Sequence, residues 1–433
     1  MKRILLLLFI SFTHIQAQVI QIGSLDEVIT IARNQSYTLE QIQMQAQLSS
    51  YDSKIAASSL LPSLTANAQS DYNLKLPVQL IPAEIFGGAP GTFNEVRFGQ
   101  DWNSNAGANF ELPIIHADKF ARAKVASKTR DQAIEDSKNN TNNYLQLVCR
   151  AYLNLLVLRE ASVLNSTLDT TATELYNTTK AFYNQQLASK VELNRAENLM
   201  LTTLQQTQNV IASTKITLNQ LKALLGIDLS DELLIDDQLN NYFIDKVPND
   251  IAAENRAVTK ASELAVEAAA WNIKQQNWMF LPKISFNSRY TFANQSNTLF
   301  SGQGTNFNYG TVGLSVSMPL FKGFSQYNQQ RKAKLQLNIA TAQWKQSIID
   351  SKAELSEWKI KFEDKRQSRE FAIRRDELAE NTLNLSLLNY NEGVISLNEL
   401  FNIYNEHVQA RNNRLQTTAD ALLYLEFLKL EQN

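Results

Sequence analysis

Residues 390–400 read YNEGVISLNEL, and residues 183–193, which begin 207 positions earlier, read YNQQLASKVEL. Tyr, Asn, Ser, Glu and Leu recur at the same places in both copies without a gap. Long stretches of helical polar–apolar pattern precede and follow each copy. Each copy is therefore predicted to be the tight turn at the tip of a long helical hairpin, and the two copies indicate an internal two-fold repeat.

Each turn contains the Ser-x-x-Glu spacing of a capping box, in which the serine accepts from the amide three residues on and the glutamate reaches back. The pairs are Ser189 with Glu192 and Ser396 with Glu399. Gly393 stands where the incoming helix must end, because glycine takes the left-handed conformation without a Cβ penalty. Gln186 occupies the equivalent position in the first copy, where it is the costlier residue.

The composition describes a chain that is neither strongly charged nor rich in loops. Of 433 residues, 41 are Lys or Arg and 43 are Asp or Glu, so the net charge of −2 does not indicate a nucleic-acid partner. Hydrophobic residues make up 44%, which is enough for packed structure. The 13 glycines and 8 prolines are too few for a disordered chain.

The first 17 residues are predicted to be a secretory signal peptide. Lys2 and Arg3 form a basic start, residues 4–12 are an apolar run too short to cross a bilayer, and Ala17 is a plausible cleavage point. A buried N-terminal helix is the alternative. No later run of 18 apolar residues occurs, so any membrane anchoring must use strands.

Both halves of the chain show the same order of elements: a helix, two strands, a long helix, the tip and a last helix. The predicted domains are a first repeat at 18–226, an acidic and irregular connector at 227–250, and a second repeat at 251–433. The helix before each tip has roughly 65–70 residues, or roughly 100 Å at 1.5 Å per residue. The first short helix is expected to run unbroken from Ser24 to about Ser59.

Four segments show the apolar–polar alternation of strands. They are residues 61–73, 102–112, 284–292 and 311–318. Residues 74–101 and 297–305 are predicted to be the loops between them, because they are rich in Gly, Pro or polar residues. Pro113 and Pro319 are expected to end the second and fourth strands, and no proline is expected inside an element, since proline lacks the amide donor.

The strands have the length and the faces of membrane-crossing strands. Each has about 11 residues, with one apolar and one polar face. Four strands cannot close a barrel, and open edges are not tolerated in lipid, so several copies must pool their strands. Three copies would give twelve strands, an even number within the known range. The alternative is a small soluble sheet, which would need a second layer that no remaining element supplies.

Catalysis finds little support in the sequence. His14, His116 and His407 show no metal-ligand spacing, and no Gly-rich phosphate loop or G-x-S-x-G motif occurs. His116 and His407 are predicted to be lone surface histidines. Cys149, the single cysteine, cannot form an intrachain disulfide and is predicted to be a buried thiol. The chain is therefore not expected to be an enzyme, and no cofactor or metal is implied.

The carboxylates at the tips are the most informative charged residues. Glu192 and Glu399 have a structural role as capping residues. Repeated by symmetry at the mouth of a helical tube, they would also form rings of negative charge, which favour cations and set a constriction. The two roles are compatible.

The pattern resembles the TolC family of outer-membrane efflux proteins over the whole mature chain. The second tip is close to the family's run Y-x-x-G-x-x-[ST]-x-x-[DE]-[LV], whereas the first departs from it at Gln186. Short proline and glycine motifs at the element junctions add to the resemblance. They are LP at 61–62 and 281–282 before strands, LP and MP at 112–113 and 318–319 after strands, and LLG at 224–226.

The resemblance implies an α+β membrane protein that works as a homotrimer. Such a trimer has a twelve-stranded β-barrel in the lipid of the bacterial outer membrane and a periplasmic tunnel of long antiparallel helical hairpins. Its tips meet a periplasmic adaptor (membrane fusion) protein that serves an inner-membrane pump. The chain would then be the passive exit duct of a tripartite efflux or type I secretion system.

The resemblance also assigns roles to residues at the tips. The family's constriction acid matches Glu399, and its second acidic position, three residues on, is Asn402 here. With Glu192 of the first tip, these are the pore-constriction candidates. The adaptor-docking candidates are Gln186, Ser189, Gly393 and Ser396.

Two other functions remain open on the residues alone. One is a periplasmic or surface coiled-coil structural protein without a channel, and the other is an enzyme carried on a helical scaffold.

Overall fold

The computed structural model describes residues 19–242, 251–299 and 304–432 and confirms the predicted helix-rich α+β fold. The described chain forms two compact units. One comprises the described parts of Met1–Ala46, Ile134–Lys260 and Lys345–Asn433, and the other those of Gln47–Ala133 and Ala261–Trp344. The predicted signal peptide and residues 243–250 of the predicted connector lie outside the described residues. The limits of the two sequence repeats stay a prediction.

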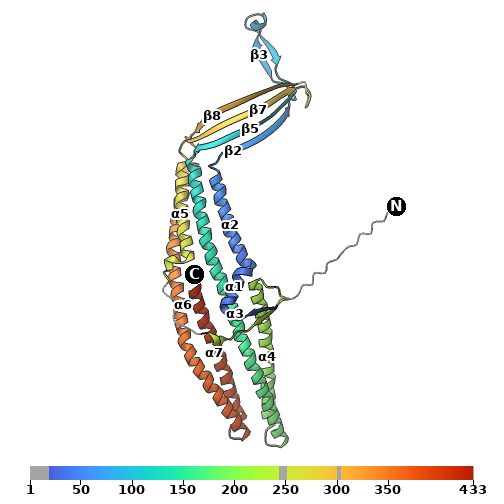
Figure 1. Ribbon diagram of the computed structural model, residues 1–433, viewed down its shortest axis with the longest axis vertical. Coiled ribbons are helices and arrows are strands. Elements are labelled where there is room, and N and C mark those ends of the chain that lie inside the picture. The colour runs from blue at the N-terminus through green and yellow to red at the C-terminus, as the bar shows by residue number, and fades with distance from the viewer. Residues whose placement is uncertain (1–18, 243–250, 300–303, 433) are drawn as a thin grey trace, which may run out of the picture. The chain divides into compact units, whose positions relative to one another are not determined.

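The helices follow the predicted order. They are α1 Leu25–Gln35, α2 Tyr37–Ser58, α3 Ala117–Asn184, α4 Lys190–Leu225, α5 Ala257–Trp278, α6 Ser325–Asn391 and α7 Leu397–Leu430 (Figure 1). The two long ones, α3 and α6, have 68 and 67 residues, and neither contains a Pro or Gly that would interrupt it. Among the described helices, none is both long and apolar enough to cross a membrane.

The predicted single helix from Ser24 to Ser59 is wrong, because it breaks at Ser36 into α1 and α2. Ser36 has extended backbone angles, φ −70° and ψ 118°, and its amide still donates to the Ala32 carbonyl. Its hydroxyl donates to the Tyr144 hydroxyl at 2.9 Å. A tertiary contact therefore overrides local helical propensity at this residue.

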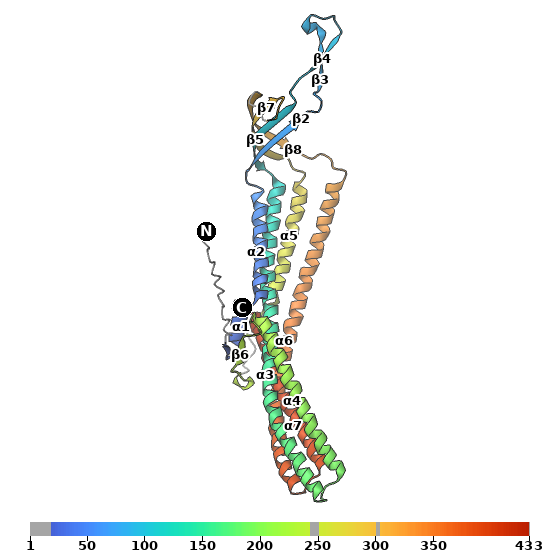
Figure 2. The ribbon, with the colours of Figure 1, turned by 90° about the vertical axis from the view of Figure 1, so that its right-hand side faces the viewer.

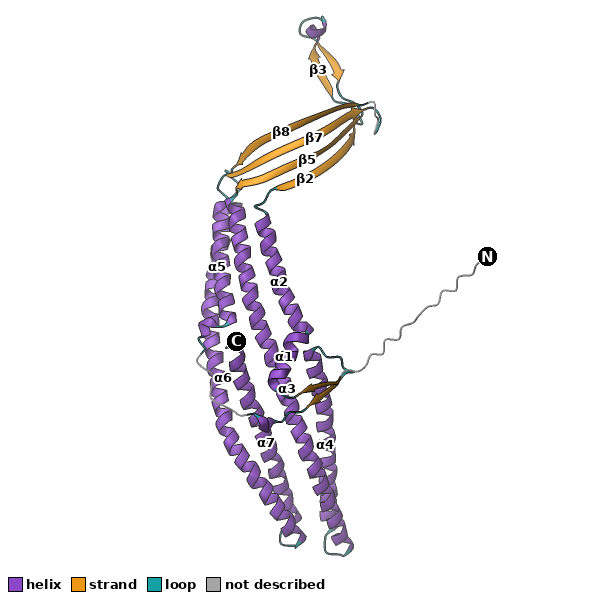
Figure 3. Ribbon diagram, in the orientation of Figure 1, coloured by secondary structure: helices purple, strands orange, loops and turns teal. Residues whose placement is uncertain are grey.

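Four strands form one antiparallel sheet in the order β2-β5-β7-β8 (Figure 3). Their bounds are β2 Ser63–Tyr72, β5 Trp102–Ile115, β7 Lys283–Ser296 and β8 Thr305–Ser317. The register places Leu64 beside Phe110, and Ser288 links Phe110 to Val312, so the apolar positions of the strands share one face. The predicted alternation is confirmed, and the sheet has two edges, β2 and β8.

Pro113 does not end its strand as predicted, because β5 continues to Ile115. Pro113 pairs with Ser285 on β7, and a register shift follows between Pro113 and Ile115. The last pair between β2 and β5 is Ser63 with Glu111, so β5 has lost its β2 neighbour where the proline stands. Proline lacks an amide hydrogen, but β5 has no hydrogen-bonded pairing with β2 at this position to lose. This explains why the sheet tolerates Pro113.

The predicted loop at 74–101 contains a second hairpin. It consists of β3 Val78–Pro82, the 3-10 turn η1 Ala83–Phe86 and β4 Phe93–Arg97. The two strands pair antiparallel, from Val78 with Arg97 to Pro82 with Phe93. Pro82 ends β3, so it is a second proline inside an element. The Gly and Pro residues of this segment correctly predicted turns, but they gave no indication of the two short strands β3 and β4.

The described part of the predicted connector is also more regular than expected. Residues Glu232–Ile235 form β6, which pairs in parallel with β1, Val19–Ile22. Two short 3-10 turns, η2 Leu239–Asn241 and η3 Ala253–Asn255, lie on either side of the gap in the described residues. Four-residue strands are too short to show a clear alternation, so the sequence pattern did not indicate them.

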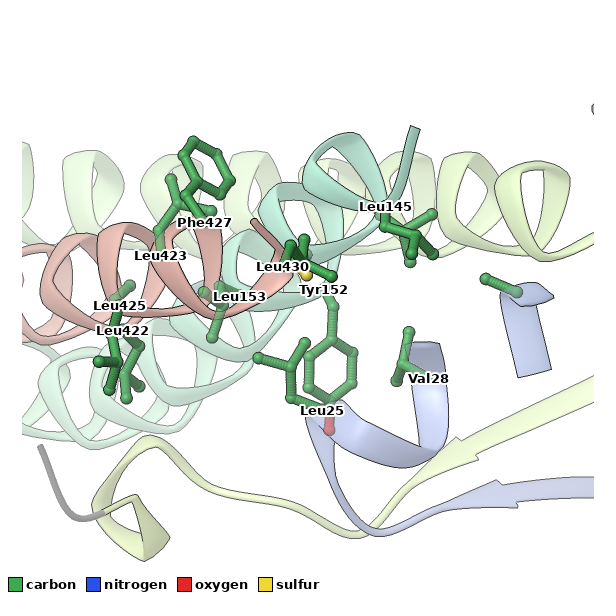
Figure 4. Packing of buried hydrophobic residues seen from close by; sticks show 14 of the residues in the cluster. Leu25, Val28, Leu145, Tyr152, Leu153, Leu422, Leu423, Leu425, Phe427 and Leu430 are labelled. Atoms are coloured by element: carbon green, nitrogen blue, oxygen red, sulfur yellow. The ribbon is translucent and has the colours of Figure 1, made fainter. Parts of the chain in front are cut away.

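The main hydrophobic core joins α1, α3, α4 and α7 within one unit (Figure 4). Tyr152 of α3 is fully buried and lies beside Leu25 of α1. Its hydroxyl donates to Asp237 Oδ2 at 2.6 Å, and the Tyr242 hydroxyl bonds the same oxygen. The single thiol, Cys149, is buried in this core as predicted, and burial raises its pKa to about 12.

We predict that Gly226→Ala will destabilise this unit more than Gly393→Ala. Both glycines are left-handed, with φ of +75° and +73°, but a Cβ at 226 would lie 2.4 Å from the Gln35 carbonyl oxygen, whereas Gly393 has no neighbour within 4 Å. Left-handed strain alone costs about 1–2 kcal/mol. The midpoint of thermal unfolding, followed by tryptophan fluorescence, should fall further for Gly226→Ala. Equal shifts would contradict the close approach of Gly226 to the α1–α2 junction.

Candidate functional site at the helical tips

The first tip forms a complete capping box, as predicted. The Ser189 hydroxyl accepts from the Glu192 amide at 3.2 Å, and Glu192 Oε2 accepts from the Ser189 amide at 2.6 Å. These two hydrogen bonds to Ser189 hold the pKa of Glu192 below its ordinary value. Glu192 is half-buried, so part of its carboxylate is engaged in the protein rather than in water.

The second tip forms only half of the predicted box. Ser396 accepts from the Glu399 amide at 3.2 Å, but no hydrogen bond from the Ser396 amide to the Glu399 carboxylate is found among the described residues. Glu399 and Asn402 are both exposed. The carboxylate of Glu399 is therefore open to solvent, whereas the carboxylate of Glu192 caps the N-terminus of α4.

Both incoming helices end in a Schellman motif, the 6→1 and 5→2 pair of amide bonds around a left-handed residue. At the first tip, Leu187 donates to Phe182 at 2.8 Å and Gln186 to Tyr183 at 3.0 Å. At the second tip, the corresponding donors are Val394 at 2.8 Å and Gly393 at 3.0 Å. Gln186 has φ +59°, which confirms that it takes the strained conformation that Gly393 takes freely.

Each tip also exposes an apolar side chain, in equivalent positions, that the sequence pattern did not indicate. Leu187 is 73% exposed and Val394 is 67% exposed. The two residues are equivalent in the repeat, directly after the left-handed residue of each turn. Their equivalence in the aligned tips is the signal that could have found them.

The two tips of one chain are bound to each other. Arg195 on α4 donates to Asn398 Oδ1 on α7 at 2.6 Å, and the hydroxyls of Thr179 and Tyr390 lie 3.0 Å apart. A second hydrophobic cluster joins α3, α4, α6 and α7 here; it contains Leu168, Leu175, Ala196, Leu383, Tyr390, Leu397, Leu400 and Tyr404. Both views of the ribbon show the two turns side by side (Figure 2).

The exposed residues of α7 form a polar stripe. Its members recur every three or four residues, the spacing of one helix face. They are Glu399, Asn402, Glu406, Gln409 and Asn413, all exposed. The stripe adds Glu406, two turns after Glu399, as a second carboxylate on the face that holds two of the constriction candidates.

A buried carboxylate binds α6 to α7 above the tip. Asp376 is fully buried; it accepts from Arg411 Nε and from Arg414 Nη1, both at 2.8 Å. Arg411 also donates to Glu380 at 2.9 Å. Asp376 and Arg411 are equally distant from the centre of the turn, so the antiparallel hairpin predicted from sequence already places them opposite each other.

His407 is not the surface residue that was predicted. It is 5% exposed, and neither ring nitrogen has a hydrogen-bond partner among the described residues. Burial, and then the charge of Arg411, lower its pKa, while Asp376 and Glu380 oppose this shift. His116 is half-buried, and its Nε2 lies 2.9 Å from the Ser285 hydroxyl.

Among the described residues, no group of three or more His, Cys, Asp or Glu side chains is placed to hold a metal ion. The tips combine exposed charged and polar side chains with two exposed turns.

Residues 247–428 match the model of a family described as outer membrane efflux protein. The resemblance to TolC-like efflux channels is confirmed. The matched residues make up less than half of the chain, and the predicted location in the outer membrane is confirmed with the resemblance. The homotrimer, the adaptor, the pump and the roles of the tip residues stay predictions.

Solved channels share the fold at low sequence identity. The outer membrane protein VceC of Vibrio cholerae is 15% identical with a TM-score of 0.73, over 93% of this chain and 94% of VceC. The CmeC outer membrane channel of Campylobacter jejuni is 16% identical with a TM-score of 0.77, over 94% and 85%. The MtrE outer membrane channel of Neisseria gonorrhoeae, solved in an open state, is 18% identical with a TM-score of 0.75, over 94% and 88%. No curated protein sequence matches the chain.

We predict that acid weakens the α6–α7 hairpin through His407. Because the pKa of the folded residue lies below its ordinary value of 6.5, the unfolded chain binds more protons between these two values, and stability falls as the pH drops below about 6.5. His407→Leu removes both the titration and the two unpartnered nitrogens. Hydrogen exchange of the α7 amides, corrected for intrinsic rates, should therefore accelerate at pH 5 in the wild type and less in the variant. Equal acceleration in both proteins would exclude His407 as the cause.

Proposed function

We propose that three copies of the chain form a passive exit duct through the outer membrane. The observation that carries the proposal is the sheet with two open edges: in the described part of the chain, β2 pairs only with β5, and β8 pairs only with β7. Unpaired strand edges are not tolerated in hydrocarbon, so β8 of one copy is expected to pair with β2 of the next. Three copies then close a barrel of twelve strands.

The exposed face of the outermost strand supports a lipid environment. Val312, Leu314 and Val316 of β8 are 72%, 69% and 68% exposed. They alternate with Thr311, Gly313 and Ser315, which is the apolar-out and polar-in pattern of a membrane barrel. In water, the same face would be a large uncovered apolar surface.

The helices α6 and α7 differ in the same way, because α6 exposes apolar residues and α7 exposes polar ones. An apolar stripe runs along α6 at steps of eleven and then seven residues, which keep to one helix face. Its members are 50–72% exposed: Ile349, Ile360, Phe371, Leu378 and Leu385. We infer that this stripe packs against a neighbouring copy, whereas the polar stripe of α7 faces the water of the tunnel.

The proposed constriction is built from the α7 stripe. Glu399, Asn402 and Glu406 would each form a ring of three in the trimer, and rings of carboxylates favour cations. Glu192 contributes less, because its carboxylate caps α4. Asn402 leaves the middle ring uncharged, so the proposed constriction is weaker than one with an acid at that position.

The proposed docking surface for a periplasmic adaptor is the pair of exposed turns. Gln186, Ser189, Gly393 and Ser396 fix the two turns in similar shapes, and all four are exposed. Leu187 and Val394 add an apolar contact at each turn. The adaptor would connect the duct to an inner-membrane pump, which supplies the energy. The alternative function is a coiled-coil structural protein without a channel.

Native mass measurement in detergent tests the assembly, and planar-bilayer recording tests the channel. We expect a mass of three chains and discrete conductance steps. A monomer that stays soluble without detergent would contradict the duct and favour the coiled-coil alternative.

We predict that charge on the α7 stripe sets cation preference. Glu399→Gln keeps the side-chain size and removes one charge per chain, so cation selectivity in the bilayer should fall. Asn402→Asp should raise it and strengthen block by multivalent cations. Glu392→Gln is the matched control, because this exposed carboxylate of the same tip lies on the last turn before Gly393 and not on the stripe. Selectivity that is unchanged in both stripe variants would show that this surface is not the constriction.

A further inference from the structure

The hairpin formed by β3, η1 and β4, residues 78–97, belongs neither to the proposed constriction nor to the proposed docking surface. It is a two-stranded ribbon, and apart from its own turn no described helix or strand packs extensively against it (Figure 1). Isolated two-stranded hairpins are marginally stable in water. This hairpin nevertheless exposes large apolar side chains: Val78 45%, Leu80 62%, Ile85 69%, Phe86 65% and Phe93 61%.

The hairpin is well formed, which indicates a defined surface. At its tip, Gly88 donates to Ala83 at 2.8 Å and Ala83 donates to Thr92 at 2.9 Å. Glu84 accepts from the Gly91 amide at 2.7 Å. A Cβ at Gly88 would lie 2.7 Å from that of Ala83, so the turn is closely packed. The apolar residues are therefore presented on a preformed element.

The pairing register sorts the side chains of the ribbon into two faces. Val78, Leu80 and Phe93 share one face with Glu95 and Arg97, while Gln79, Ile81, Asn94 and Val96 lie on the other, where Ile81 and Val96 are half-buried. Among the described residues, neither Glu95 nor Arg97 has an ion-pair partner in its own chain. One face thus combines exposed apolar residues with one positive and one negative charge, so copies of this face around a three-fold axis could pair opposite charges head to tail.

We propose that the three hairpins of a trimer pack against one another and form an outer gate over the mouth of the barrel. The proposal rests on the proposed trimer, because three copies bring three hairpins around one axis. Each hairpin joins β2 to β5, at the sheet end opposite the strand ends that lead into α3 and α6. Arg97 of one copy then faces Glu95 of the next.

The dimensions allow the hairpins to meet. Twelve strands about 4.8 Å apart and tilted by about 40° make a barrel of roughly 12 Å radius. Five residue pairs in the ribbon rise about 17 Å, before the turn is added. Each hairpin is therefore long enough to reach the axis from the rim.

Cysteine crosslinking tests the contact between copies. In a Cys149→Ala background, Phe86→Cys at the turn should give covalent dimers with a short bifunctional maleimide, whereas Asn94→Cys, on the ribbon face away from Leu80 and Phe93, should be labelled but not crosslinked. If Phe86→Cys reacts with a monofunctional maleimide and native mass shows three chains, yet no crosslink forms, the gate is wrong and the patch faces lipid or another partner. A mass other than three chains would instead contradict the trimer on which the gate depends.

Bilayer recording tests the gate itself. The triple variant Leu80→Asn, Phe86→Asn, Phe93→Asn should raise the open-channel conductance roughly twofold by loosening the constriction. The matched control, Gln79→Ser with Asn94→Ser, should leave conductance unchanged. Unchanged conductance in a triple variant that retains three chains and its thermal midpoint would show that the hairpins do not narrow the mouth.

Discussion

The open edges of the four-stranded sheet are the constraint on which the rest of the account depends. Within the residues that the structure describes, β2 and β8 each leave one side of their backbone without a partner, and the apolar residues of β8 are mostly exposed. In lipid, each unpaired amide or carbonyl costs several kcal/mol, so the sheet is stable there only when another copy supplies the missing edge. The proposed trimer meets this requirement, because β8 of each copy would pair with β2 of the next.

The other unit of the chain has a hydrophobic core of its own. Its core buries Tyr152 and the leucines of six helices, and the buried residues Arg256, Asp376 and Glu426 form ion pairs. Arg256, for example, bonds both oxygens of Glu431 at 3.0 Å and one of Glu354 at 2.7 Å. The helical core can therefore form within one chain, whereas the open edges of the sheet need strands from neighbouring copies.

Much of the fold follows from periodic features that the sequence displays openly. The lengths of α3 and α6, the two tips and the four long strands each rest on many residues, so single exceptions do not obscure them. The break at Ser36, the β1–β6 pair and the strands of the 78–97 hairpin rest on tertiary contacts or on few residues, and local pattern did not reveal them. At the tips, the spacing predicted two capping boxes, but only the structure distinguishes the engaged Glu192 from the solvent-exposed Glu399. It also places His407 in the interior, where helical position alone gave no such indication.

Pairing of β8 with β2 of a neighbouring copy is the central claim, and disulfide scanning across that edge tests it most directly. In a Cys149→Ala background, one cysteine at Ala66 of β2 would be combined in turn with one at each position from Gly310 to Leu314 of β8. Within one chain, β5 and β7 separate these strands, so oxidation should produce covalent dimers and trimers at positions of matching register and no species larger than three chains. Absence of interchain disulfides at every position, or crosslinks only between two β2 strands, would contradict the account.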